Sequence, residues 1–404
     1  MFKGMKKILV TSAVGIMSIA LMSGCGGQEA SQNTSPTDSG NKTENASQEP
    51  IKVGVIGAYS GGSADMGITM RNGVEMAIEK FNAAGGVDGR KIEIINYDDE
   101  ANPTKATSGA QKLISSEKVV AILGNPSTAT SIATANAARA SEVPQIVPIA
   151  QSPEVLEPAS PWIFRVSATN PMDIEKMIQY VKQQGWSKVG LIYDTSAYGM
   201  SGKQILDEVV PANGLEIVAS EGYTVGAPDL TTQALNLQKA NPDVILIWGL
   251  GADQGRFVSN VDKIGWDVPV MGGRGTIFKI FTEIGGAAAD GTIATASLDL
   301  SQDEVKAWVD EYKGKYGEKG TIDFAALGYD AANVLIEAMK KANESGDINR
   351  QSVRDAIESI DNIDPITGPV DYALSFGPEK HEGASVDAVI LVEHQDGKWV
   401  PLEN

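Results

Sequence analysis

IKVGVIG, residues 51–57, is a short apolar run that ends in glycine, and apolar residues then recur at helical spacing from 70 to 81. The run predicts a buried strand and the spacing predicts a helix behind it. The same order repeats along the chain, with strands expected at 91–97, 119–124 and 144–148 and helices at 103–115 and 131–140. Such alternation predicts right-handed βαβ crossovers and a doubly wound parallel sheet.

The pattern restarts after Asn170-Pro171. Residues 188–193 (KVGLIY) and 243–248 (DVILIW) are nearly continuous apolar runs, which are typical of strands buried on both faces of a parallel sheet. The roughly 350 residues from Ile51 onward exceed what one hydrophobic core normally holds. We therefore expect an α/β protein with two doubly wound lobes.

The amino terminus has the composition of an export signal. Lysines precede an apolar run at 8–22, and Ser23-Gly24 leads into Cys25, the only cysteine of the chain. Small residues directly before a cysteine resemble a bacterial lipobox, in which the cysteine is lipidated. We expect a signal peptide at 1–24, a lipidated Cys25 opening a polar, flexible tether at 25–50, and an extracytoplasmic protein anchored to the cell membrane, on its periplasmic face or at the cell surface. A plain secretory signal with a chance cysteine is the alternative.

Composition disfavours several classes of function. The formal charge of −19 argues against nucleic-acid binding, which depends on Lys and Arg. His381 and His394 are the only histidines and no HExxH is present, so we expect no metal site and no Ser-His-Asp triad. His381 lies in a polar stretch and is expected to be solvated. The glycine-rich turns lack GxGxxG and P-loop spacing, so no cofactor is expected.

Ligands of open parallel sheets bind beyond the carboxyl ends of the strands. The turn at 124–130 (GNPSTAT) is the most informative strand end, because hydroxyl residues lead from it into a helix. Free N–H groups and the dipole at a helix start attract anions, so a carboxylate is a natural ligand there. Alternatively, Ser127 or Thr128 only caps its own helix. The local sequence favours neither.

Several motifs together resemble one family. They are GAYSGG at 57–62 with Gly67, FNAAGGVDGRK at 81–91, YDD at 97–99 with Asn102-Pro103, LGNPSTATS at 123–131, PIAQSP at 148–153 and DTSAYG at 194–199. The chain resembles the solute-binding proteins of branched-chain amino acid ABC transporters, which have the type I periplasmic binding fold. The resemblance implies two lobes that close on a ligand around three hinge crossings. The lobes expected are 51–169 plus 298–366 and 170–297 plus 367–404.

The resemblance also implies a ligand site in the cleft between the lobes. Met66 would lie over the ligand, Thr128 and Ala129 would bind its carboxylate, and Tyr198 would contact it from the second lobe. Carboxylate and ammonium would be held at the strand end formed by Ile149, Ala150 and Gln151. The position that pairs with the ammonium in the family falls near Arg274.

Two of these residues depart from the family pattern. Gln151 stands where threonine is usual, and Arg274 stands where Glu or Asp is common. An arginine cannot pair with an ammonium and binds carboxylates in a bidentate manner. Either Arg274 points away and another acid such as Asp253 serves, or the ligand is not an ordinary amino acid. We expect Arg274 to favour an acidic or non-amino ligand.

The expected function is a lipid-anchored receptor that delivers a small carboxylate-bearing solute to ABC permease subunits. A sensory receptor for amides or small organic acids with the same fold is the alternative. An enzyme is disfavoured because no nucleophile–base arrangement or cofactor motif is recognisable. A purely structural surface lipoprotein would not need two matched sets of strand-end loops.

Overall fold

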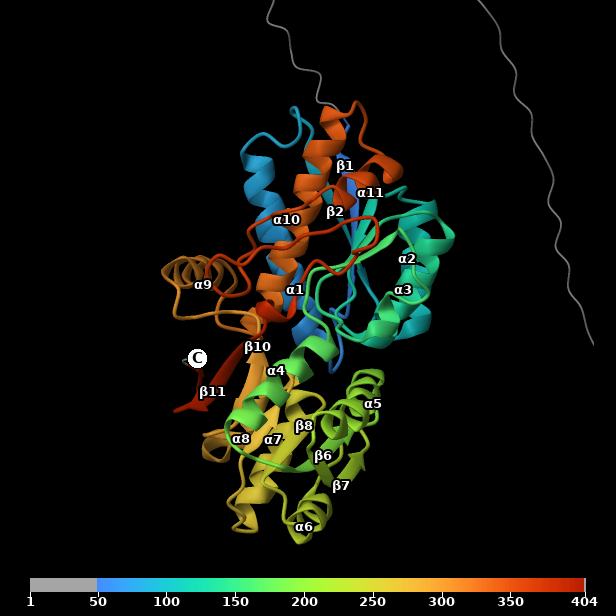
Figure 1. Cartoon of the computed structure of the whole chain (residues 1–404). Coiled ribbons are helices and arrows are strands. Elements are labelled where there is room, and N and C mark those ends of the chain that lie inside the picture. Colours follow the sequence, from blue (N-terminus) through green and yellow to red (C-terminus); the bar gives the residue numbers. More distant parts are fainter. Residues whose placement is uncertain (1–48, 403–404) are drawn as a thin grey trace, which may run out of the picture. The chain divides into compact units, whose positions relative to one another are not determined.

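Two sheets, each covered by helices on both faces, form the part of the chain that the computed structural model describes, residues 49–402 (Figure 1). The expected signal peptide at 1–24, Cys25 and nearly all of the expected tether at 25–50 lie outside the described residues. The mixed α/β architecture with parallel strands confirms the predicted fold class.

The first sheet is entirely parallel and has the order β2-β1-β3-β4-β5. Three further helices from late in the chain, α9 to α11, pack against the same body. Its elements are β1 (Ile51–Gly57), α1 (Ala64–Ala83), β2 (Ile92–Asp98), α2 (Pro103–Ser115), β3 (Ala121–Leu123), α3 (Thr128–Ala140), β4 (Gln145–Val147), a short 3-10 turn η1 (Pro153–Val155), β5 (Ile163–Arg165), α9 (Asp303–Tyr316), α10 (Ile322–Glu344) and α11 (Arg350–Glu358).

Strand β1 is buried on both faces because its side chains alternate between two cores. Val53 and Val55 pack with α1, α10 and α11, whereas Ile56 packs with α2 on the opposite face. Figure 1 shows α1 and α10 on one side of β1 and β2, with α2 and α3 on the other. The near-continuous apolar sequence of this strand follows from that double burial.

The second sheet has the order β12-β11-β10-β9-β8-β6-β7 and is parallel except where β11 pairs with β10 and β12. Its elements are α4 (Asn170–Gln183), β6 (Lys188–Asp194), α5 (Ala197–Ala212), β7 (Glu216–Tyr223), α6 (Thr231–Lys239), β8 (Val244–Trp248), α7 (Gly251–Lys263), β9 (Val270–Gly272), the 3-10 turn η2 (Arg274–Ile277), α8 (Lys279–Gly285), the 3-10 turn η3 (Gly286–Ala289), β10 (Ile293–Ala296), β11 (Ile390–Gln395) and β12 (Lys398–Pro401). The 3-10 turn η4 (Val386–Ala388) precedes β11 and packs with the core of the first body.

The chain passes between the two bodies three times, before α4, after β10 and before β11. Leu374, Phe376, Ala384 and Val389 are buried in the core of the first body. We therefore propose that the last crossing follows Val389, later than the boundary at residue 367 expected from the sequence. The remaining lobe limits stay predictions.

Helix α3 begins at Thr128, three residues before the helix expected at 131–140. The sequence analysis left the hydroxyl-bearing residues 128–130 in the preceding turn, whereas in the structure they belong to the first turn of α3. The difference matters because it makes Thr128 and Ala129 the first residues of the helix.

Within residues 49–402, no helix combines the length and the apolar character needed to cross a membrane.

Asp330 of α10 gives the fold a pH-dependent contribution. It accepts hydrogen bonds from the N–H groups of Ile366 (2.8 Å) and Thr367 (3.1 Å). Burial nevertheless raises the pKa of Asp330 to about 6. The folded protein thus keeps this proton to higher pH than the unfolded chain, so the stabilisation is complete below about pH 4 and is lost as the pH rises through about 6.

We predict that Asp330→Asn becomes progressively more stable relative to wild type between pH 4 and pH 7. The total change in the difference of unfolding free energy should be on the order of 2–3 kcal/mol. Urea denaturation at several pH values would measure it. Asp303→Asn, at an exposed position on α9, is the control and should give a flat difference. Parallel pH profiles for wild type and Asp330→Asn would contradict the prediction.

Candidate functional site

A cavity of about 210 Å³ lies between the two bodies, and all eight residues expected to bind ligand line it. They are Met66, Thr128, Ala129, Ile149, Ala150, Gln151, Tyr198 and Arg274. The rest of the lining is Ala101, Pro126, Ser127, Ser196, Ala197, Leu250, Gly275, Phe278 and Phe324. The volume is below the roughly 300–1,000 Å³ of drug-sized sites and fits a small solute.

The start of α3 presents unused donors to this cavity. The first helical hydrogen bond runs from Ser131 N to Ser127 O (2.9 Å), so the N–H groups before Ser131 have no partner in the helix. Ser127 does not cap the helix, because its hydroxyl lies 2.8 Å from Thr130 Oγ1. The Thr128 hydroxyl makes no hydrogen bond within the described residues. The capping interpretation therefore does not account for this turn, and anion binding at this helix start stays a prediction.

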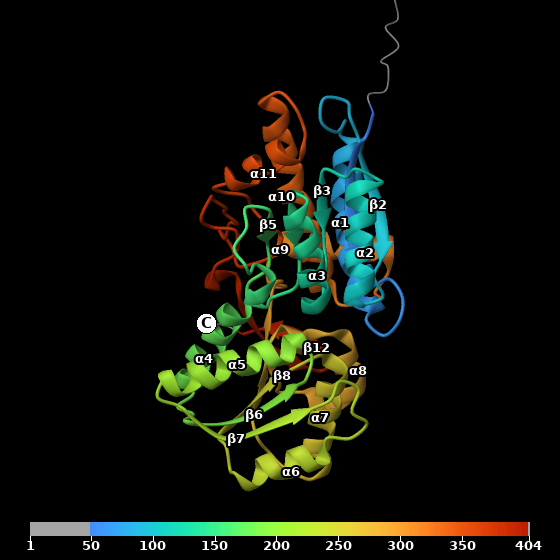
Figure 2. The same ribbon diagram turned by 90° about the vertical axis from the view of Figure 1, so that its right-hand side faces the viewer.

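A second helix start faces the cavity from the other body. Ser196, Ala197 and Tyr198 open α5, and α5 contacts α3 (Figure 2). The Tyr198 ring stacks on Trp248 with centroids 5.5 Å apart, and its hydroxyl accepts a hydrogen bond from Gly275 N (3.3 Å). Burial raises the pKa of Tyr198, so the phenol is neutral at physiological pH.

A buried carboxylate, Asp173 of α4, joins two of the expected site residues. Its Oδ1 accepts from Arg274 Nη2 (2.9 Å), and its Oδ2 accepts from Gln151 Nε2 (2.8 Å) and Thr295 Oγ1 (2.9 Å). Asp173 is fully buried and Arg274 is 2% exposed. Arg274 Nη1 also donates to Ser297 Oγ. Sequence reasoning missed Asp173, since no local motif marks it.

This pairing changes the expectation for Arg274. The sequence shows no partner for the Arg274 cation, whereas in the structure Asp173 compensates its charge. Asp253, the alternative acid, bonds Gly226 N (2.8 Å) and Arg256 and is not part of the lining. Arg274 is the only charged side chain among the described lining residues. A preference for acidic ligands therefore does not follow from the presence of Arg274 alone.

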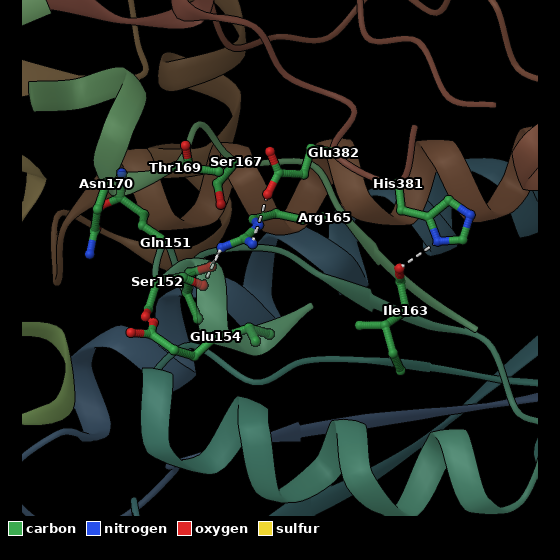
Figure 3. Close-up of polar contacts among 12 residues, drawn as sticks. Gln151, Ser152, Glu154, Ile163, Arg165, Ser167, Thr169, Asn170, His381 and Glu382 are labelled. Atoms are coloured by element: carbon green, nitrogen blue, oxygen red, sulfur yellow. Dashed lines mark hydrogen bonds and ion pairs between the residues drawn. The ribbon is translucent and has the colours of Figure 1, made fainter. Parts of the chain in front are cut away.

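Arg165, at the end of β5, supports the loop that carries Gln151. Its Nη1 donates to the carbonyls of Ala150 (3.0 Å) and Ser152 (2.8 Å), and its Nη2 pairs with Glu382 (3.1 Å; Figure 3). Burial lowers the pKa of Arg165 to about 10, which still leaves it charged at neutral pH. An arginine at the end of an otherwise apolar strand was the available signal, and the sequence analysis did not use it.

His381 is not the solvated residue that was expected. Its Nδ1 lies 3.1 Å from Ile163 O (Figure 3). Its Nε2 lies 3.2 Å from Glu358 Oε1, and the ring stacks on Phe164. The polar sequence around it did not reveal that β5 and α11 supply these partners. No group of three or more metal-ligating side chains occurs within residues 49–402.

The two bodies touch on both sides of the cavity. On one side Ser201 of α5 bonds Ser152 (3.0 Å) and Glu154 (3.2 Å). On the other, Phe278 packs edge-on against Phe324, and Lys279 N donates to Thr321 Oγ1 (3.1 Å). These contacts enclose the cavity between surfaces of both bodies, which is the arrangement of a cleft that closes around a small molecule.

Residues 50–393 match the family model described as periplasmic binding protein, and the chain belongs to that family. The Leu/Ile/Val-binding protein homolog 7 of Brucella abortus is 27% identical over 373 residues, covering 87% of this chain and 91% of the relative. The leucine-, isoleucine-, valine-, threonine- and alanine-binding protein of Pseudomonas aeruginosa is 25% identical over 350 residues, covering 86% and 91%. The resemblance found in the sequence is thereby confirmed at the level of the family.

Solved structures of periplasmic binding proteins share this fold. A periplasmic binding protein type 1 from Bordetella pertussis superimposes with a TM-score of 0.78 at 29% identity, covering 87% of this chain and 99% of that one. The branched-chain amino acid transporter substrate-binding protein LivJ of Streptococcus pneumoniae, solved with isoleucine, gives 0.78 at 25% identity, covering 87% and 99%.

We predict that Thr128→Val weakens binding of a carboxylate ligand by about tenfold or more, because a hydrogen bond to a charged group contributes roughly 1.5–3 kcal/mol. Valine keeps the shape and removes only the hydroxyl. Isothermal titration with the best ligand of the panel described below would measure the change. Ser127→Ala is the matched control and should change affinity little, since its hydroxyl already bonds Thr130. Equal losses in both variants would contradict this role for Thr128.

Proposed function

We propose that the protein is an extracytoplasmic solute-binding lipoprotein of an ABC transporter. It binds a small carboxylate-bearing ligand, a branched-chain amino acid or a related organic acid, between its two lobes and delivers it to the permease subunits. The observation that carries this proposal is the cavity lined by both bodies, in which the uncapped start of α3 faces apolar walls.

The polar end of the cavity favours a carboxylate. The N–H groups at the start of α3 are donors that have no partner within the helix. The Thr128 hydroxyl is a donor that has no partner among the described residues. The dipole of α3 places its positive end at this cavity, whereas the start of α5 is capped by Ser196 and lies beside Asp194. Hydrogen bonds from neutral donors to an anion are stronger than those between neutral groups.

The remaining walls favour an apolar body on the ligand. Large apolar side chains line the cavity, namely those of Met66, Ile149, Leu250, Phe278 and Phe324. Burying apolar area contributes roughly 25 cal/mol per Å². Leu250 and Phe278 belong to the second body, so a ligand held by the first body would gain contacts with them on closure, and such extra contacts would favour the closed state.

The anchoring part of the proposal rests on the sequence of the amino terminus and on the family. Periplasmic binding proteins act outside the cytoplasm, and a lipidated Cys25 followed by a polar tether would hold such a protein at the membrane. A sensory receptor for amides or small organic acids remains the alternative, because it would use the same cleft.

We predict that leucine, isoleucine or valine raises the apparent melting temperature by several degrees. Ligand at about one hundred times its dissociation constant adds roughly 2.7 kcal/mol of stability. A thermal-shift panel should also hold aromatic acids, dicarboxylates and amides. Stabilisation by amides but by no carboxylate would favour the sensory alternative. Turnover of a solute without any stabilisation would contradict the solute-binding role.

Cys25→Ser is expected to release the protein from membranes into the soluble fraction. The reason is that stable anchoring requires acyl chains, which the serine variant cannot receive on sulfur. Fractionation of cells expressing wild type and variant, followed by immunoblotting, would measure it. Retention of the variant in the membrane fraction would contradict the lipid anchor and leave the ligand proposal untouched.

A further inference from the structure

We propose that Asp173, which does not line the cavity, determines which ligands the cleft accepts. It does so by compensating the charge of Arg274 and by orienting the amide of Gln151. The inference rests on the proposed function, because it concerns the ligand class of the same cleft.

The first step concerns charge. Arg274 Nη2 lies 2.9 Å from Asp173 Oδ1, and both side chains are almost completely buried. The pair contributes no net charge to the cavity. Removal of one member of a buried ion pair leaves the other charge uncompensated, which is costly unless something else compensates it. Without Asp173, Arg274 would lose its only ion-pair partner among the described residues, and an anionic ligand in the cavity would compensate its charge.

Asp323 is the other acid near Arg274. Its carboxylate accepts hydrogen bonds from Ser297 N (2.7 Å) and Leu298 N (3.2 Å), not from Arg274. Burial raises the pKa of Asp323, which disfavours its charged form. Asp173 is therefore the carboxylate that is directly hydrogen-bonded to Arg274, whereas Asp323 forms no salt bridge with it.

The second step concerns hydrogen-bond polarity. Gln151 Nε2 uses both of its hydrogens, on Asp173 Oδ2 (2.8 Å) and on Ala168 O (3.1 Å). The amide can hold only this orientation, since a carboxylate and a carbonyl both require donors. The carbonyl oxygen Oε1 is then the end of Gln151 available to a ligand. An acceptor at this place fits a ligand N–H.

The two steps define a ligand class. The α3 start takes a carboxylate, Gln151 Oε1 takes a donor, and the compensated Arg274 adds no net attraction for a second negative charge. Such a cleft favours a ligand that carries an ammonium beside its carboxylate over the corresponding simple carboxylate. Asp173 is a positioning residue in this scheme, because it acts through Arg274 and Gln151.

Leucine and 4-methylpentanoate test the proposal, because they share a carbon skeleton and differ in the ammonium group. Isothermal titration of the full chain should show wild type binding leucine at least about tenfold more tightly, a difference of one good hydrogen bond to a charged group. In Asp173→Asn the ratio of the two affinities should fall by about tenfold or more. The reason is that Arg274 loses its counter-charge and the amide of Gln151 is no longer held in one orientation.

Thr295→Val is the matched control. It removes another hydrogen bond to the same carboxylate without changing any charge, and it should keep the wild-type ratio. If Asp173→Asn does not fold, Arg274→Gln tests the same charge balance by removing the positive member of the ion pair instead of the negative one. It leaves Asp173 uncompensated and should weaken 4-methylpentanoate more than leucine.

The outcomes separate the two proposals. An unchanged ratio in Asp173→Asn, or the same change in Thr295→Val, overturns the role of Asp173 while the proposed function stands. Binding of neither compound by wild type contradicts the proposed ligand class, and this inference falls with it. A ratio that falls in Asp173→Asn and rises in Arg274→Gln supports the proposal.

Discussion

The carboxylate of Asp173 is the interaction on which the arrangement of the cleft depends. It accepts three hydrogen bonds, from Gln151, Arg274 and Thr295, and is fully buried. These partners belong to the loop after β4, to η2 and to β10, so one side chain fixes parts of both bodies close to two of the crossings. A buried ion of this kind is tolerated only when its lone pairs are satisfied, and each bond therefore limits where its partner can lie.

The cavity combines two kinds of surface that the fold supplies for different reasons. Donors gather at its polar end because parallel strands lead into helix starts at one edge of the sheet. Apolar walls come from side chains such as Phe278 and Phe324, which lie on opposite bodies and meet across the cleft. A ligand that satisfies both must be small, because the two bodies already touch on either side of it.

Local patterns predicted the sheets and pointed to the turn at 124–130, which lines the cavity, because strand burial and helix starts depend on neighbouring residues. The ligand-site residues other than those of the turn at 124–130 were placed by resemblance to a family. Asp173 could not be found this way, since it meets Arg274, 101 positions away in sequence, only through the fold. The same holds for His381, whose partners come from β5 and α11. Partners distant in sequence leave no periodic signal, so the charge balance of the site emerged only from the structure.

The starts of α3 and α5 differ in a way that bears on the proposed capture of a solute. Each helix start behaves as roughly half a positive charge. At α5 the Ser196 hydroxyl accepts a hydrogen bond from Gly199 N (3.1 Å), and Asp194 Oδ1 accepts one from Ser196 N (2.9 Å), so that start is capped and lies beside a carboxylate. The start of α3 has no side-chain cap. With the proposed ligand, capture would be partly an electrostatic neutralisation, in which the cargo supplies at α3 the negative charge that Asp194 already places at α5.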